Sequence, residues 1–190
     1  MRQLKLSKAF TLIEPGPVVL VTTCAAGRAN VMTISWTMVL DFTPLFAFTT
    51  GPWNHSFAAL EQQRECVIAI PTVDLLDTVV GIGTCSGRDT DKFARFGIAA
   101  LAGPVLGVPL IEAGCAAWME CRLIPERHTE DAYDTCFAEV VAAAADPAVF
   151  ADGRWDFRAD NAALHTLHHL GAGNFARASD VIRAQPLQAA

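Results

Sequence analysis

The segment from Ser86 to Phe93 has the composition of an anion-binding turn. Its first two residues are small enough for a ligand to approach the backbone, and Arg88 and Lys92 bring positive charge to the same turn. Residues 89–91 predict the acidic first turn of a helix, whose free amide groups would point towards the anion. Alternatively, the charged residues form only a solvated helix cap, and their spacing alone favours neither interpretation.

A second set of polar groups lies on the strand predicted over residues 30–36, which follows a turn at residues 27–29. Hydroxyl-bearing and apolar residues alternate here, as expected for a half-buried strand. One face consists of Thr33, Ser35 and Thr37, and the other of Met32, Ile34, Trp36 and Met38. Strand propensity alone favours a packing role, because Thr and Ser suit a pleated surface. The alternative is that these hydroxyl groups and the neighbouring amide groups line a polar ligand.

The other motifs of the sequence do not indicate a nucleotide-binding or metal site. The glycines of residues 81–87 are spaced wrongly for a dinucleotide-binding G-x-G-x-x-G loop, and they follow a predicted helix rather than a strand. The sequence contains no P-loop. His165, His168 and His169 could share a helical face, but no carboxylate accompanies them at a matching spacing. A packing or capping role is therefore favoured, and no metal site is predicted.

Composition restricts the class of protein. Hydrophobic residues make up 52% of the 190 residues and charged residues 18%, which excludes a disordered chain and predicts one domain over residues 1–190. The net charge is −6, from 14 Lys and Arg against 20 Asp and Glu, and there is no basic run. Nucleic-acid binding therefore has little electrostatic support, and a bound anion must be held by local groups.

The sequence shows no targeting or membrane-spanning segment. Lys and Arg are spread through the first residues instead of preceding an apolar block. The longest uncharged run, residues 96–111, is interrupted by Gly and Pro and is shorter than the roughly 18 residues that a spanning helix needs. The six cysteines form no C-x-x-C pair, so we expect buried free thiols. These features predict a soluble cytoplasmic protein without membrane contact.

The strand and helix patterns predict an antiparallel barrel. Strands are expected over residues 17–24, 30–36, 45–49, 66–70, 116–124 and 133–141. Helices are expected after a cap at Asn54 or Ser56 and over residues 72–80, 89–96 and 160–170, with a turn at residues 152–154. Glu120 and Arg122 are expected to face solvent. Because strands and helices do not alternate regularly, a mainly β barrel surrounded by helices is favoured.

Eight blocks of sequence, taken together, indicate a family. They are residues 15–23 (PGPVVLVTT), 30–36 (NVMTISW), 54–57 (NHSF), 65–71 (ECVIAIP), 86–93 (SGRDTDKF), 120–122 (ECR), 139–140 (EV) and 167–175 (LHHLGAGNF). In this order they resemble the flavin reductase and flavoredoxin family of FMN-binding split barrels, which no single motif could indicate as specifically. The resemblance covers roughly residues 10–175, and residues 176–190 are expected to form a loosely ordered tail.

The resemblance implies a mainly β (α+β) fold, a six-stranded antiparallel Greek-key split barrel with peripheral helices. It also implies a homodimer with FMN bound at or near the dimer interface. Matched position by position, the flavin contacts would be Asn30, Thr33, Ser35 and Trp36, with Asn54, His55 and Ser56 beside the phosphate or ribityl chain. Ser86, Arg88 and Lys92 would complete the polar cradle, with Phe175 against the ring. Lys92 is the strongest phosphate candidate.

The chain departs from the family pattern at two positions. Trp53 stands where many relatives carry Arg, which implies one phosphate ligand fewer and a lower flavin affinity. Tyr133 stands where others place a His, shortly before the Glu-Val strand.

The family resemblance implies an oxidoreductase that transfers a hydride from NAD(P)H to flavin. The cofactor carries the reactivity, so a catalytic triad or carboxylate pair is not needed. The electrons would pass to free flavin, oxygen, a partner monooxygenase or another redox protein. The alternative is a flavoredoxin-type carrier that keeps FMN and accepts electrons from a protein partner, and a flavin-free relative is a third hypothesis. The sequence does not separate these functions, and it does not indicate whether NADH or NADPH is preferred.

These assignments require an irregular strand. In a regular strand Asn30 and Trp36 lie on the opposite face from Thr33 and Ser35. All four can reach one ligand only through a bulge, a strand end or backbone contacts. We therefore predict irregular pairing between residues 30 and 37.

Overall fold

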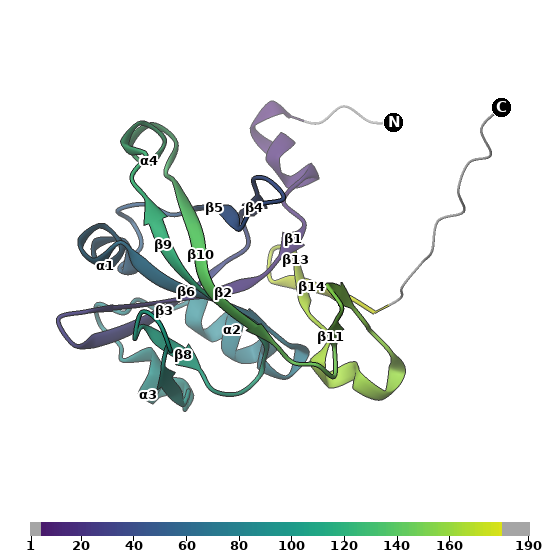
Figure 1. Cartoon of the computed structure of the whole chain (residues 1–190). Helices are drawn as coiled ribbons and strands as arrows, with labels where there is room; N and C mark the ends of the chain where they lie inside the picture. The colour runs from purple at the N-terminus through teal and green to yellow at the C-terminus, as the bar shows by residue number, and fades with distance from the viewer. Residues whose placement is uncertain (1–4, 180–190) are drawn as a thin grey trace.

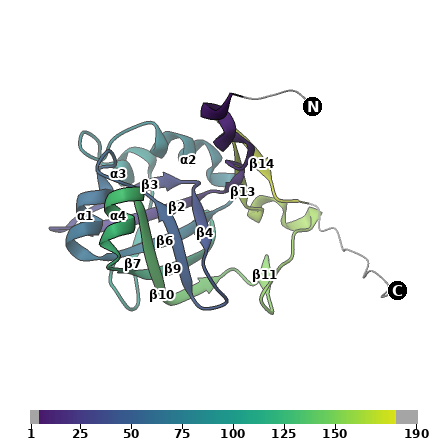
Figure 2. The same ribbon diagram turned by 90° about the horizontal axis from the view of Figure 1, so that it is seen from above.

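A curled antiparallel sheet forms the centre of the computed structural model, which describes residues 5–179 (Figures 1 and 2). The seven strands of this sheet are hydrogen-bonded in the order β3-β2-β6-β9-β10-β5-β4. Their bounds are β2 Val19–Ala25, β3 Arg28–Ile34, β4 Thr37–Val39, β5 Leu45–Thr49, β6 Glu65–Pro71, β9 Cys115–Ile124 and β10 Thr135–Ala145. Each of the six strands predicted from the sequence corresponds to part of this sheet.

The sheet closes towards a barrel because its two edge strands are consecutive in the chain. β3 pairs with β2 in unbroken register from Arg28 to Ile34, and β4 pairs only with β5, starting at Thr37. Ser35 and Trp36 join the two edges. The predicted irregularity is therefore confirmed as a break in pairing, and it explains why seven strands are present where six were expected. The predicted split-barrel class is confirmed.

Two apolar layers stabilise the sheet, one on each face. On β2, Val19 and Val21 face the barrel interior, where they meet residues such as Phe48 and Cys121. Val18 and Leu20 face outwards, into a layer covered by the helix α2 (Leu76–Gly83). Both faces are thus buried where β2 begins, and residues 18–21 form a continuous apolar run instead of an alternating one.

Short helices surround the barrel. They are η1 Leu6–Leu12, α1 Ser56–Gln63, η2 Val73–Leu75, α2 Leu76–Gly83, α3 Lys92–Phe96, α4 Arg127–Tyr133 and η3 Ala159–Leu164. Three of the predicted helices are confirmed, but α2 continues past Gly81 to Gly83. The Phe96 ring packs where a Gly81 Cβ would lie, so glycine at this position serves close packing. The helices η1 and α4 were not predicted from the sequence. No helix within residues 5–179 is long and apolar enough to cross a lipid bilayer.

Smaller sheets complete the fold. They pair β1 Gly16–Pro17 with β13 Leu167–Gly171 and β14 Asn174–Arg177, β7 Ala100–Ala102 with β8 Pro109–Ile111, and β11 Phe150–Ala151 with β12 Arg154–Trp155. The predicted turn at residues 152–154 is confirmed between β11 and β12. The predicted tail begins inside β14, and its residues from 180 onwards lie outside the described residues.

The helix predicted over residues 160–170 is wrong beyond Leu164. At His165 the backbone becomes extended, with φ −65° and ψ 141°, and the chain continues into β13. β13 pairs with both β1 and β14, and this long-range pairing outweighs the local helical periodicity. The three histidines therefore do not share a helical face.

The predicted solvent exposure of Glu120 is also wrong. Its side chain is fully buried, beneath the loop that joins β7 to β8. Its carboxylate accepts hydrogen bonds from the amide groups of Val105, at 3.0 Å, and Leu106, at 2.7 Å. The alternation on β9 is real, but the outer face is covered at this point, so a charged residue there fixes a loop.

We expect replacement of Glu120 by Ala to lower the free energy of unfolding by about 2–3 kcal/mol, because hydrogen bonds to a charged acceptor are lost and two amide groups lose their partner. Arg122→Ala is the matched control on the same strand, since Arg122 is exposed, and should change stability by about 0.5 kcal/mol or less. Urea unfolding of both variants measures the difference. Equal losses in the two variants would show that the loop does not depend on Glu120.

Candidate functional site

Three segments that are distant in the sequence meet at one point beside β3. Asn30 is buried on β3 and donates a hydrogen bond from Nδ2 to Ser56 Oγ, 2.8 Å away, at the start of α1. Gly87, in the loop before α3, packs against both segments. A Cβ on Gly87 would overlap the Asn30 carboxamide and lie 2.7 Å from His55 Cδ2, so only glycine allows this approach.

A hollow of about 190 Å³ lies beside this junction. We call it the Lys92 hollow. It is lined by Asn30, Met32, Trp53, Asn54, His55, Ser56, Gly83, Thr84, Cys85, Ser86, Gly87 and Lys92. Six of the eleven predicted site residues are thus brought together: Asn30, Asn54, His55, Ser56, Ser86 and Lys92. Sequence reasoning missed the segment from Gly83 to Cys85, whose only signal was its small residues.

Lys92 is the charged group of this hollow. The residue is only 6% exposed, and its Nζ donates to the Ile82 carbonyl oxygen at 2.8 Å. No carboxylate within the described part of the chain forms an ion pair with it. Desolvation by burial lowers the pKa of Lys92. A buried ammonium group without a counter-ion is a candidate partner for an anion.

Local sequence explains the position of Lys92 at the first residue of α3. The Asp91 carboxylate caps the helix by accepting from the Ala94 amide at 3.0 Å, and Gly97 ends it in a left-handed conformation. The predicted acidic first turn over residues 89–91 is wrong, because these residues precede the helix and only Asp91 contacts it, as the cap. This arrangement fixes the backbone from which the Lys92 side chain reaches back to α2.

The N-terminus of α1 adds amide groups to the same site. The predicted side-chain cap is wrong, because neither Asn54 nor Ser56 caps the helix. Asn54 Nδ2 donates instead to Thr50 Oγ1 at 3.2 Å, and Ser56 Oγ accepts from Asn30. The first turn of α1 therefore has no capping side chain and presents the positive end of the helix dipole.

The remaining predicted residues lie around this centre. Ser35 and Trp36 line a second cleft, of about 510 Å³, together with Phe10 and Ile13. We call it the Trp36 cleft. Trp36 is half exposed and packs edge-on against Phe10, with ring centroids 6.1 Å apart. The Lys92 hollow lies beside Asn30 and Met32 of β3, and the Trp36 cleft lies just beyond the C-terminal end of β3.

Three predicted residues make other contacts. Thr33 donates from its hydroxyl to the Val79 carbonyl oxygen at 2.8 Å, so it holds α2 against β3. Phe175 packs on His169, with ring centroids 5.2 Å apart, in the outer apolar layer. Arg88 is exposed, and its amide donates to Ser86 Oγ at 3.2 Å. The structure does not bring these three side chains into the Lys92 hollow.

The two departures from the family pattern have different surroundings. Trp53 is largely exposed and borders the Lys92 hollow, with its ring against Gly51. Tyr133 ends α4, is also largely exposed, and packs edge-on against His128 with ring centroids 5.8 Å apart. Trp53 is thus placed to influence what enters the hollow.

Comparisons with known proteins define the family. Residues 13–158 match the family described as "Flavin reductase like domain". The chain is 42% identical over 177 residues to an uncharacterised Escherichia coli K12 protein, YddH, with 90% of this chain and 92% of YddH covered. The chain therefore belongs to the flavin reductase like family, and the resemblance predicted from the sequence blocks is confirmed.

Solved structures share the fold. An FMN-binding domain of a flavin reductases-like enzyme from Shewanella baltica superposes with a TM-score of 0.85 at 33% identity, covering 96% of each chain. The flavoredoxin of Desulfovibrio vulgaris (Miyazaki F) superposes with a TM-score of 0.78, covering 100% of this chain and 96% of its own. The identity to this flavoredoxin is 19%, so that comparison supports the fold alone.

Proposed function

We propose that the protein binds FMN and reduces it with a hydride from NAD(P)H. The observation that carries this proposal is Lys92, a buried cation that faces a hollow without a counter-ion among the described residues. A flavin phosphate supplies the missing negative charge. The likeness to the Shewanella baltica protein, which is described as FMN-binding, supports the same cofactor.

The donors present in the Lys92 hollow fit a phosphate group. The Lys92 ammonium group, the Ser86 and Ser56 hydroxyl groups and the Ser56 amide group at the start of α1 are the kinds of donor that bind phosphate oxygens. Asn54 and His55 are proposed to contact the phosphate or the ribityl chain. Arg88, at the rim of the same loop, adds positive charge that attracts an anion over a longer range.

The flavin ring is proposed to lie towards the Trp36 cleft. Asn30, Ser35 and Trp36 are the proposed contacts, with Thr33 and Phe175 acting through the layer that supports them. FMN, once bound, supplies the hydride-accepting and electron-transfer chemistry. The chain's own residues bind the phosphate, orient the ring and exclude water. Its electron acceptor is proposed to be free flavin, oxygen, a partner monooxygenase or another redox protein.

We also propose that the protein works as a cytoplasmic homodimer. The surface of η1 and β4 exposes large apolar residues that no described segment covers: Leu6, Phe10, Leu12, Ile13, Trp36, Met38, Val39, Leu40 and Phe42. We call this the η1–β4 surface. Apolar patches of this kind mark protein interfaces, and a second copy covering this one would enclose the Trp36 cleft. All six cysteines are free thiols, which supports a reducing compartment.

We expect Val39→Asp, on the η1–β4 surface, to convert the dimer into a monomer, because the interface would have to bury an unpaired carboxylate. Leu101→Asp is the matched control, since Leu101 is also exposed, 56% against 64% for Val39, but lies on β7. Light scattering after gel filtration gives the mass of each variant. A wild-type monomer, or a dimer that survives Val39→Asp, would contradict this interface.

The visible spectrum of the purified protein tests the proposed reaction. Added FMN should give a bound flavin spectrum, and anaerobic NADH or NADPH should bleach it while the nicotinamide is oxidised. Retention of flavin without any reaction with either nicotinamide would instead indicate a carrier of the flavoredoxin kind. Absence of flavin binding would overturn the proposal and favour a flavin-free relative.

A further inference from the structure

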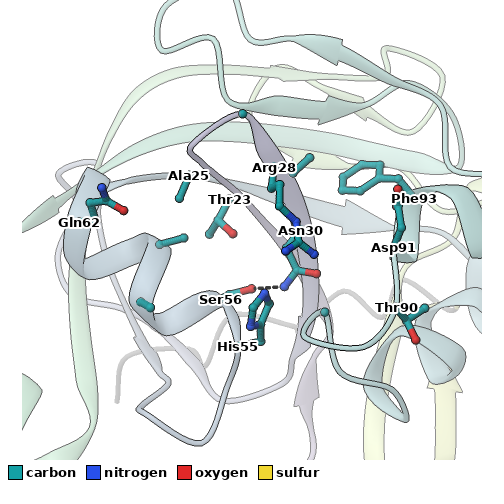
Figure 3. Close-up of a pocket in the computed structure, with 15 residues that line it drawn as sticks. Thr23, Ala25, Arg28, Asn30, His55, Ser56, Gln62, Thr90, Asp91 and Phe93 are labelled. Atoms are coloured by element: carbon teal, nitrogen blue, oxygen red, sulfur yellow. Dashed lines mark hydrogen bonds between the residues drawn. The ribbon is translucent and has the colours of Figure 1, made fainter.

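A second concave site adjoins the Lys92 hollow, and the proposed function leaves it without a role. It is a cleft of about 470 Å³, which we call the hairpin cleft (Figure 3). Figure 3 shows α1 on one side, the β2–β3 hairpin in the middle and the start of α3 on the other side. Its lining includes Thr23, Arg28, Ala58, Gln62, Asp91 and Phe93.

Thr23, in the lining of this cleft, has a hydroxyl group without a partner. Thr23 lies directly opposite Asn30 in the β2–β3 pairing and is 1% exposed. Its Oγ1 forms no hydrogen bond with any described residue. Leaving a buried hydroxyl group unsatisfied costs about 1–3 kcal/mol, so such groups often belong to ligand sites. The lining of the cleft thus contains a polar group whose hydrogen-bonding capacity is not used by the described residues.

The walls of the hairpin cleft suit a flat and nearly neutral group. Small residues from the hairpin and from α1 line it: Ala25, Gly27, Ala29, Ala58 and Ala59. Phe93 adds an aromatic side chain to the lining, and Gln62 offers both hydrogen-bond donors and an acceptor. The charges of Arg28 and Asp91 offset each other, and Asp91 is already engaged as the cap of α3. A purine nucleoside has this combination of a flat ring and several polar edges.

The position of the cleft indicates what the nucleoside would be attached to. Asn30, His55, Ser56 and Gly87 line both the hairpin cleft and the Lys92 hollow. A phosphate held in the hollow is therefore next to the cleft, on the side away from Trp36. A group joined to that phosphate can enter the cleft without displacing the flavin ring.

We propose that the hairpin cleft is a subsite for the adenylate group of a dinucleotide. This proposal rests on the proposed function, because it takes the Lys92 hollow to be the phosphate site. Two dinucleotides carry this group to such a site: FAD, through the flavin phosphate itself, and the nicotinamide nucleotide, through its adenosine half. The shared chemistry is a purine ring against Phe93 and the alanines, with Thr23 and Arg28 as hydrogen-bond donors.

A bulky substitution in the cleft tests the proposal. Ala58→Trp places an indole in the hairpin cleft from an exposed position on α1, and Ala58 does not line the Lys92 hollow. Gln63→Trp is the matched control, because it puts the same side chain at an exposed position at the end of α1, outside the residues that line this cleft. Binding of FMN, FAD and AMP to the full-length protein is measured by flavin fluorescence or calorimetry. The KM for NADH is then measured with the FMN-loaded protein.

If the adenylate group in the cleft belongs to FAD, wild-type protein should bind FAD about tenfold more tightly than FMN. Ala58→Trp should then bind FAD no more tightly than FMN, while its FMN affinity stays within about twofold of the wild type. If the adenylate group belongs to the nicotinamide nucleotide, Ala58→Trp should raise the KM for NADH about tenfold while FMN affinity is unchanged. In both cases AMP should compete with the nucleotide concerned, and Gln63→Trp should behave as wild type.

The proposal is overturned if wild-type protein binds FMN but Ala58→Trp changes neither FAD affinity nor the KM for NADH. Failure of the proposed function looks different, because the wild type would then not bind FMN at all. In that case, a direct measurement of AMP binding tests whether the hairpin cleft is an adenylate subsite. AMP binding that Ala58→Trp abolishes supports the subsite, and absence of AMP binding removes it.

Discussion

Replacement of Lys92 by Met is expected to reduce FMN affinity about 100-fold, because a charged partner of the phosphate would be lost from a buried site. Methionine has a similar length and shape, so the packing around α2 and α3 is retained. Lys92 forms no ion pair with any described residue, and its one hydrogen bond to protein is to the Ile82 carbonyl oxygen. The change should therefore act on the ligand and not on the fold.

The stability of the flavin-free protein separates these two roles. Burial lowers the pKa of Lys92, so near neutral pH the folded state carries a desolvated charge that disfavours folding. That penalty is relieved as the pH rises through the lowered pKa towards the ordinary value of 10.5. Lys92→Met removes the penalty, so its melting temperature without FMN at neutral pH should equal or exceed that of the wild type.

Lys8→Met is the matched control for Lys92→Met. Lys8 is exposed on η1, and its replacement should leave FMN affinity within about twofold. Fluorescence quenching of FMN gives both dissociation constants. Unchanged FMN affinity in a folded Lys92→Met variant would remove Lys92 as the phosphate partner. Lys92→Gln provides a second folded variant in case the methionine disturbs the loop.

The sequence predicted the barrel well because its strands carry local signals. Residues 45–49 lie between Pro44 and Gly51, residues 66–70 are followed by Pro71, and both segments are rich in β-branched or aromatic residues and form strands. The helix α3 was likewise indicated by an acidic residue before its first turn and by Gly97 after its last residue. Such signals act within a few residues, so no tertiary information is needed to detect them.

Where tertiary contacts decided the outcome, the sequence could not predict it. Glu120 alternates as a solvent-facing residue should, yet a loop more than ten residues away in the sequence covers it. The chain after His165 has helical spacing, yet pairing with Gly16 and Pro17 makes it a strand. Residues such as Thr23 and Gly83 have no sequence signal of their own. They become site residues only because the β2–β3 hairpin, α1 and α2 meet.

The candidate site depends on a second buried charge, which lies outside it. Glu130 on α4 has a side chain that is 2% exposed, and it binds Arg64, the residue that ends α1. The two carboxylate oxygens lie 2.6 Å and 3.1 Å from the Arg64 guanidinium nitrogens. Arg64 also donates to the Ile124 carbonyl oxygen at 3.0 Å. This contact fixes the far end of α1, the helix whose first turn faces the Lys92 hollow.

We expect Glu130→Ala to lower the free energy of unfolding by about 3–5 kcal/mol, because it leaves the Arg64 guanidinium partly buried without its carboxylate. Asp131→Ala is the matched control on the same helix. Asp131 is exposed and lies 3.4 Å from Arg127, and removing this surface pair should cost about 1 kcal/mol or less. Urea unfolding at neutral pH compares the two variants. A loss for Glu130→Ala no greater than that for Asp131→Ala would contradict a structural role for the buried pair.

The same ion pair predicts a pH dependence with a definite sign. The hydrogen bond from Arg64 lowers the pKa of Glu130 below its ordinary value of 4.5, so the folded state binds the proton less readily than the unfolded chain does. The stabilisation is complete at pH values above 4.5 and is lost as the pH falls through the lowered pKa of the folded state. Glu130→Gln, which cannot ionise, should show a smaller loss of stability over that range than the wild type. Parallel acid-unfolding curves for the wild type and Glu130→Gln would show that other carboxylates determine acid stability and that this contact is not ionic.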